Sequence, residues 1–598
     1  MENSDKLLYD LSSEVDNAPA SPFISKTWLS VLDNNQGQYA SSNVTIDTSQ
    51  LSNSNKYCSY REAYLQVPLL ITVSSNQVNG FAPATAATAA SYSVGLKSFF
   101  GSLIHTLSVN YNGTQIIQAM PFQSVLNSFK LCTSLSWQDV RSQGTSLGFW
   151  PDDPTAFTYH LSAAPDLDGV GVCNSKNLAS ASAASYGVAT NFNSYNGFVA
   201  NEGFRKRQSA INWDADGGAD ASYSYFFTAN NANTMYKSHV IRKINAVTGT
   251  TNGVYQVAVS ATIMLRHLSS LFNNLPLVKG AFITMQLQLN NSTTVVQKSA
   301  FVAAVVGPPA VAQINAATTL VSVNSAVGGI NPLMIASMQP GSGGQAFNAT
   351  PTNAVTITAS VSIGSRCLEP TQLAIAGVTT GAIGNSITLN LPTYVLSPVF
   401  EQAYLSNPIR SVPFSDFYFY QLTAQAPGAT INALLSNGIA NLQRITIFPV
   451  LSASSAASTQ LPAGTPVYSS PFDPALTSGF GSPLLHISQF QIQVAGSNVL
   501  ANAQRYTYEQ WLHEIGSCGS VNGGLTDGVS SGLLSKEGWE MAPVYTCDLS
   551  RMLPAERSIP KSVVLQGINI SAMTVDYMCF IEFAQEGLKI DVLSGAKV

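Results

Sequence analysis

One structural pattern occurs twice in this chain, once in each half. Apolar and polar residues alternate over residues 103–111, the pair Asn112-Gly113 follows, and residues 121–129 carry an apolar stripe at helical spacing. Alternation predicts a half-buried strand, and Asn-Gly predicts a tight hairpin because both residues accept positive φ angles. Residues 490–515 repeat this order around Gly496. The repetition predicts two related β domains rather than a solenoid of many short repeats.

The two helical stripes correspond closely. Each places large apolar residues at positions i, i+3, i+4 and i+7, which form one face of a helix. The first stripe consists of Phe122, Val125, Leu126 and Phe129, and the second of Tyr508, Trp511, Leu512 and Ile515. An insertion of three residues between the glycine turn and the second helix brings the two copies into register.

Apolar and polar residues also alternate, with a period of two, in much of the remaining chain. Residues 283–289 and 573–583 alternate in the same way, and Gly, Pro and Asn separate such runs. β-branched and aromatic residues recur within them, as in the strands of sandwiches and barrels. A mainly β fold with a few short helices is predicted.

Composition limits the classes to which the chain can belong. Its 598 residues exceed what one hydrophobic core normally organises, so at least two domains are expected. Charged residues make up only 10%, against about 25% in a typical soluble protein, and the net charge is −5. This balance argues against an extended nucleic-acid-binding tract. Residues 1–10 lack the apolar core of a signal peptide and residues 301–312 are too short to span a membrane, so a soluble chain made inside the cell is expected.

A Gly-, Ser-, Asn- and Pro-rich stretch over residues 325–353 predicts a linker or long loop between the halves. Another low-complexity stretch, residues 169–220, predicts a long surface loop. The resulting division is an N-terminal arm over residues 1–38, a first domain with long surface loops over residues 39–330, and a second domain over residues 331–598.

The N-terminal arm carries few strand signals. Trp28, Leu29 and Leu32 lie at helical spacing. We expect this arm to dock on a neighbouring molecule or an inner layer, with a terminus lying on its own domain as the alternative.

Two short motifs suggest catalysis but lack the context that catalysis needs. Residues 144–148 match GxSxG, yet Phe149 to Pro154 cannot continue a helix, so a loop is predicted instead of a nucleophile elbow. His513-Glu514 lacks the second histidine of HExxH, because Ser517 occupies that position.

The remaining polar clusters favour structural roles. Asp214, Asp216 and Asp220 fail the spacing of a calcium loop and predict a solvated acidic turn. The basic run over residues 204–207 predicts a solvated or inter-subunit loop, with contact to nucleic acid or an acidic partner as the alternative. His105 and His486 are expected to be hydrogen-bonded structural residues.

The seven cysteines are far apart and form no CxxC pair, which predicts reduced, mostly buried thiols. With no convergent constellation of reactive groups, we expect no catalytic, cofactor or metal site, and a chain that is not an enzyme.

Five further segments have sequences that are characteristic in combination and weak singly. They are Tyr60 to Pro68, Pro398 to Leu405, Ser470 to Pro474, Arg551 to Pro554, and Ile590 to Gly595. Together with the duplicated element, they resemble the double jelly-roll major capsid proteins of the adenovirus, tectivirus, virophage and large DNA virus lineage. The resemblance is closest to the capsid proteins of polinton-like viruses and virophages. Residues 140–238 match nothing in that family.

The resemblance implies two tandem eight-stranded jelly rolls with short helices in loops. It further implies that three copies form a homotrimer of pseudo-hexameric outline, and that such capsomers tile the icosahedral shell of a dsDNA virus virion assembled inside the host cell. The implied partners are the chain itself, penton and minor capsid proteins, and an inner membrane or genome reached through the arm. No small-molecule substrate is implied.

Two other functions compete with this reading. A trimeric glycan-binding fibre or adhesin would share the β signals but not the duplication. A glycoside hydrolase would need two carboxylates across a cleft, and Asp152 and Asp153 are adjacent in a Pro-flanked turn.

Overall fold

The computed structural model describes most of the strands and helices of the chain. The described residues are 21–36, 39, 43–51, 55–78, 92–96, 99–151, 207, 240–245, 252–290, 292–298, 319–325, 333–337, 355–363, 386–452, 486–500, 506–517, 533–534, 536, 539, 543–551, 554–571 and 574–598. Within them, no helix is long and apolar enough to cross a membrane.

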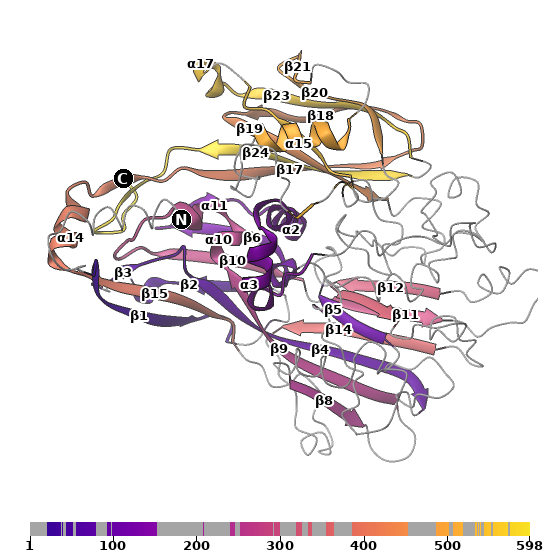
Figure 1. Cartoon of the computed structure of the whole chain (residues 1–598), viewed down its shortest axis with the longest axis horizontal. Helices are drawn as coiled ribbons and strands as arrows, with labels where there is room; N and C mark the ends of the chain where they lie inside the picture. Colours follow the sequence, from indigo (N-terminus) through magenta and orange to yellow (C-terminus); the bar gives the residue numbers. More distant parts are fainter. Residues whose placement is uncertain are drawn as a thin grey trace, which may run out of the picture.

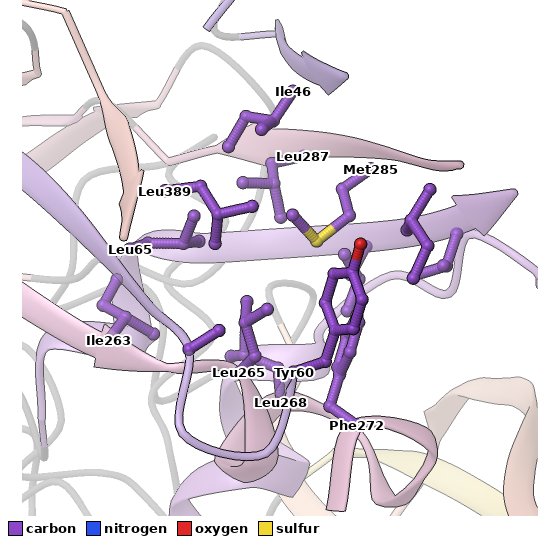
Figure 2. Close-up of a cluster of buried hydrophobic side chains, with 14 of the residues drawn as sticks. Ile46, Tyr60, Leu65, Ile263, Leu265, Leu268, Phe272, Met285, Leu287 and Leu389 are labelled. Atoms are coloured by element: carbon purple, nitrogen blue, oxygen red, sulfur yellow. The ribbon is translucent and has the colours of Figure 1, made fainter. Parts of the chain in front are cut away.

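The first half of the chain forms a jelly roll, called barrel 1. One sheet contains, in spatial order, β1 (Phe23–Leu32), β15 (Thr388–Leu396), β4 (Tyr64–Val78) and β9 (Asn252–Met264). The other contains β2 (Asn43–Asp47), β10 (Ile283–Leu289), β6 (Ile104–Tyr111) and β7 (Thr114–Ile117). Figure 2 shows Leu65 and Leu389 of the first sheet in the same buried cluster as Ile46, Met285 and Leu287 of the second. Their burial makes one core between the two sheets.

The second half forms a jelly roll of the same design, called barrel 2. One sheet contains β17 (Phe414–Gln425), β24 (Val575–Gln585), β19 (Leu442–Leu451) and β22 (Tyr545–Asp548). The other contains β18 (Thr430–Ile439), β23 (Lys561–Asn569), β20 (Ile487–Val494) and β21 (Ser497–Asn498). In Figure 1 these strands form the orange and yellow layers above barrel 1.

The strand order is the same in both barrels. If the eight barrel strands are counted along the chain, one sheet has the order 1-8-3-6 and the other the order 2-7-4-5 in each barrel. This closes two antiparallel sheets over one core, as a jelly roll does. The predicted fold class, mainly β with two tandem eight-stranded jelly rolls, is confirmed by the connectivity of the chain itself.

The duplicated hairpins are also confirmed. Asn112 and Gly113 have φ angles of 47° and 79°, and Ala495 and Gly496 have φ angles of 50° and 82°. Two consecutive positive φ angles define the turn type whose twist matches that of the flanking strands. The predicted helices follow as α2 (Gln123–Ser134) and α15 (Tyr508–Ser517).

Barrel 1 carries a sheet extension that barrel 2 lacks among the described strands. β4 is 15 residues long, and beyond the barrel it pairs with β14 (Val355–Ile363). β11 (Ser292–Lys298) and β12 (Thr319–Ser325) continue that sheet beyond β14, and β8 (Val240–Asn245) pairs with β9. β5 (Tyr92–Leu96) and β13 (Leu333–Ser337) form a separate pair. Figure 1 shows these strands projecting away from both barrels. β13 lies within residues 325–353, for which a linker or long loop was predicted.

The remaining elements are short. They are β3 (Tyr57–Cys58), η1 (Ser49–Leu51), η3 (Phe100–Leu103), α3 (Trp137–Leu147), α10 (Leu265–Leu268), α11 (Ser270–Asn274), α14 (Pro398–Leu405), β16 (Ile409–Ser411), α17 (Pro554–Arg557) and β25 (Lys589–Asp591).

The sheets do not divide at residue 330, where the sequence suggested a boundary. β14 and β15 lie beyond it and still pair with β4 of barrel 1. The change to barrel 2 pairing falls between β15 and β17, across α14 and β16. A Gly-, Ser- and Asn-rich stretch marks a break between strands whether or not they share a sheet, which explains the displaced boundary.

The expectation of a helically spaced arm is wrong for residues 23–32. They form β1, which pairs with β15 in the register Trp28↔Pro392. Val31 is buried in the barrel 1 core at 1% exposure. Apolar residues four apart share a face of a strand as well as of a helix, so this spacing did not separate the two. An arm in the predicted sense is left with residues 1–20, outside the described part.

Helix α2 joins the two barrels. Its stripe of Phe122, Val125, Leu126 and Phe129 belongs to the core of barrel 2. The ring of Phe129 meets Phe448 of β19 at 5.5 Å between centroids, edge to face. Aromatic pairs in this geometry add to the stabilisation from burial.

Two N-terminal deletions separate the arm from the strand. We expect deletion of residues 1–20 to leave the thermal unfolding midpoint within a few degrees of the full chain. Deletion of residues 1–38 also removes β1 and the core residue Val31, so it should cause aggregation or a large fall in that midpoint. Circular dichroism melts check this, and equal midpoints for the two deletions would contradict the placement of β1.

A substitution in α2 tests the junction between the barrels. Phe129→Ala should lower the free energy of unfolding by about 3–5 kcal/mol, because it opens a cavity in the barrel 2 core. Trp137→Ala, on the neighbouring helix, is the control, because Trp137 is 59% exposed and should cost little. Chemical denaturation measures both; equal losses would show that α2 does not join the barrels energetically.

Candidate assembly surface

The outward face of β1 exposes a row of large apolar side chains. Ile24, Trp28 and Leu32 are 67%, 51% and 57% exposed. Trp28 and Leu32 lie four residues apart on the same side of the strand, and Ile24 lies at an irregularity in the β1–β15 pairing. β1 is also the edge strand of its sheet as described. Exposed apolar rows and unpaired strand edges mark surfaces that bind another protein. We call Ile24, Trp28 and Leu32 the β1 row.

Charged and aromatic neighbours hold the β1 row in place. The ring of Trp28 packs on Tyr64 at 5.6 Å, and Lys26 Nζ lies 5.4 Å from the Trp28 ring. Lys26 also donates to Glu62 at 2.5 Å. Partial burial opposes the charge on both partners, but their hydrogen bond outweighs it, so the pKa of Lys26 is raised and the pKa of Glu62 is lowered. The row is presented on an ordered surface.

The equivalent surface of barrel 2 is covered from within the chain. β17 is the first strand of barrel 2, as β1 is of barrel 1. Its outward side chains Phe417 and Phe419 contact helix α2: Lys130 Nζ lies 4.2 Å from the Phe417 ring, and Phe122 lies 5.4 Å from Phe419. In the described structure, one of two equivalent sheet faces is packed and the other is open. This asymmetry makes the β1 row the candidate functional site.

The sequence pointed to Trp28 and Leu32 as part of a docking arm, but not to the strand that presents them. The alternation of Ile24, Lys26, Trp28 and Ser30 with Ser25, Thr27 and Leu29 carries only a faint strand signal, because both sets mix polar and apolar residues. A comparison of the two copies within the chain could have identified it. β1 is the counterpart of β17, which has a clear run of aromatic residues over Phe417 to Tyr420.

The GxSxG motif lies in a helix and not in the predicted loop. Residues 144–147 form the last turn of α3, which Gly148 ends with a φ of 63°. Ser146 Oγ donates to the carbonyl of Gln143 at 2.8 Å. α3 follows a helix and not a strand, so Ser146 does not have the geometry of a nucleophile elbow.

The other singled-out residues make the following contacts where they are described. Glu514 is buried and accepts hydrogen bonds from Arg551 at 2.6 Å and from the backbone of Asp548 at 2.8 Å. His105 packs edge to face on Phe122, and burial lowers its pKa. His486 has its backbone carbonyl bonded by Ile570 in barrel 2.

The basic run is corrected at the one residue that is described. Arg207 is 7% exposed and donates to the backbone carbonyls of Leu96 and Trp150, so it is not a solvated loop residue. Residues 204–206, the acidic turn with Asp214, Asp216 and Asp220, and the pair Asp152-Asp153 lie outside the described residues.

Four cysteines are described; all are buried and none is in a disulfide, as predicted. They are Cys58, Cys132, Cys547 and Cys579. Burial raises the pKa of Cys58 to about 12, which keeps it a thiol at neutral pH. In the described part of the chain, no group of three His, Cys, Asp or Glu residues is arranged to hold a metal ion.

No protein-family model matches the chain. No curated protein matches it either. Solved structures from viruses match it along most of its length. A chain of the Sputnik virophage is 11% identical, with 98% of this chain and 90% of that chain covered and a TM-score of 0.48. The mavirus major capsid protein is 10% identical, with 98% and 92% covered and a TM-score of 0.36. The Faustovirus major capsid protein is 9% identical, with 98% of both chains covered and a TM-score of 0.38.

Proposed function

We propose that this chain is a major capsid protein, a non-enzymatic building block that packs against copies of itself to form a virus shell. The proposal rests on one difference between two equivalent sheet faces: one is covered within the chain and the other is exposed. The outward face of β17 is covered by α2 of the same chain, whereas the β1 row is open. A second copy would cover the β1 row.

Such a contact is heterologous, because it joins two different surfaces of the same chain. Heterologous contacts close into rings when the rotation between copies permits. With two similar barrels per chain, a ring of three copies presents six similar barrels, which is a homotrimer of pseudo-hexameric outline. Rings of that shape can tile a closed icosahedral shell, and the chain would then be found in the virion.

The sparse charge of the chain supports extensive packing between copies. Only 10% of its residues are charged. A charge that is buried without a partner at a contact is costly, whereas Ser, Thr, Asn and Gln exchange hydrogen bonds across wet contacts at little net cost. Penton and minor capsid proteins are the further partners we propose, and residues 1–20 are the segment that would reach an inner membrane or genome.

A substitution in the β1 row tests self-assembly. We expect the full chain to sediment as a trimer and Trp28→Ser to shift it toward the monomer by more than tenfold in the association constant. Burial of a large apolar side chain contributes about 1.5–3 kcal/mol, and the trimer would lose one such contribution at each interface. Analytical ultracentrifugation measures the shift, and far-ultraviolet circular dichroism checks that the barrels remain folded.

Ile559→Ser is the matched control. Ile559 is 54% exposed, comparable to Trp28, but lies between α17 and β23 on barrel 2. It should leave the trimer unchanged. A trimer that survives Trp28→Ser would overturn the role of the β1 row. A full chain that is monomeric at all concentrations, or that binds glycans on an array, would overturn the capsid proposal in favour of an adhesin-type protein.

A further inference from the structure

A charged cavity lies at the junction of the two barrels. It has a volume of about 740 Å³ and is lined by both of them. Barrel 1 contributes Lys130 of α2 and Arg266 and His267 of α10, and barrel 2 contributes Arg444 of β19 and Glu582 of β24. In Figure 1 these elements meet where α2, α10 and α11 approach β17 and β24. Cavities of about 300–1,000 Å³ are the size in which proteins bind small molecules.

Cations outnumber carboxylates in the lining of this cavity by four to three. Four of the 27 lysines and arginines of the chain line it, namely Arg61, Lys130, Arg266 and Arg444. Three carboxylates line it as well, and two of them already have partners. Glu582 forms an ion pair with Arg444, with both side chains about 5% exposed. Asp139 accepts hydrogen bonds from the backbone and hydroxyl of Ser136 at 2.9 and 2.6 Å. The third, Glu586, is exposed.

Two cations of the cavity have no carboxylate within ion-pair distance among the described residues. In the described structure, neither Lys130 nor Arg266 forms an ion pair. Lys130 Nζ lies over the ring of Phe417 at 4.2 Å, and burial lowers its pKa to about 8. Beside it, His267 stays neutral, because burial and the nearby Arg266 lower its pKa to about 4. Partly desolvated cations that share a cavity repel one another, and an anion between them removes that repulsion.

We propose that this cavity binds a small polyvalent anion built from phosphate groups, of the size of inorganic triphosphate. Lys130 and Arg266 from barrel 1 would supply the charge, and Gln443 of β19 in barrel 2 lines the same cavity. The side chains of Ser134, Gln143 and Asn273 also line the cavity and can donate hydrogen bonds to phosphate oxygens. Because the ligand contacts both barrels, it would stabilise their junction, and it would do so in a single chain whether or not the chain forms capsids.

The ionisable groups around Lys130 give binding a defined pH dependence. Below pH 8 Lys130 is charged and binding is strong; above it, the lysine loses its proton and binding weakens. Asp416, whose pKa burial raises to about 6, faces Lys130 from β17, and Glu582 and Arg444 face it from β24 and β19. Protonation of Asp416 below pH 6 removes a negative charge near Lys130, while the phosphate groups also take up protons near that pH.

Isothermal titration calorimetry with sodium triphosphate on the full chain tests the proposal. At pH 7 and constant ionic strength we expect saturable binding and a rise in the thermal unfolding midpoint. Arg266→Gln should weaken binding about tenfold, the loss expected for one charge-assisted contact. Lys130→Met should weaken it and abolish the fall in affinity above pH 8. Arg557→Gln is the control, because Arg557 is exposed on α17, away from the cavity.

Three results would overturn the proposal. One is equal stabilisation by sodium chloride and triphosphate at the same ionic strength. Another is unchanged affinity in Arg266→Gln when that variant unfolds at the wild-type temperature without ligand. The third is a single-stranded oligonucleotide that displaces triphosphate and loses affinity in the same variants, which would assign the cavity to nucleic acid. None depends on trimer formation, so this test and the sedimentation test can fail separately.

Discussion

The packing of α2 against barrel 2 is the interaction on which the architecture depends. It leaves β24 buried on both faces over residues 575–582. Inward side chains such as Ile581 fill the barrel 2 core, and outward ones such as Phe580 meet the layer that contains Phe129 and Phe448. A strand buried on both sides can carry an ionic group only if it is paired. Glu582 is such a group, and Arg444 of the adjacent strand pairs with it.

The same packing distinguishes the two copies of the fold. The barrels share one strand order, yet the helix of the first copy covers a face of the second. The matching face of barrel 1 has no cover within the described chain, and its apolar row remains in contact with solvent. The chain thus covers one of two equivalent sheet faces internally and leaves the other open in its described part. The exposed apolar face of barrel 1, whose equivalent in barrel 2 is covered, gives copies of the chain a physical reason to associate.

Local chemistry was predictable from the sequence, and long-range pairing was not. The two hairpins and helices could be identified because Asn112-Gly113, Gly496 and the apolar stripes act over a few residues. β1 could not, because its partner β15 lies more than 350 residues away and supplies the burial that makes it a strand. The boundary at residue 330 was misplaced for the same reason. Neighbouring cavity cations are separated by 69, 136 and 178 residues in sequence, so no motif joins them.

The closing strand of barrel 1 also sets an order of events during synthesis. β1 and β2 leave the ribosome early, but the first sheet lacks its central strand until β15 is made, after the whole extension of β11, β12 and β14. Barrel 2, by contrast, uses one nearly continuous stretch from β17 to β24. Contacts of large sequence separation form slowly, because the entropy of closing the intervening chain must be overcome first. β1 therefore stays without its partner strand through most of translation. During this interval a chaperone could bind its exposed edge and apolar side chains.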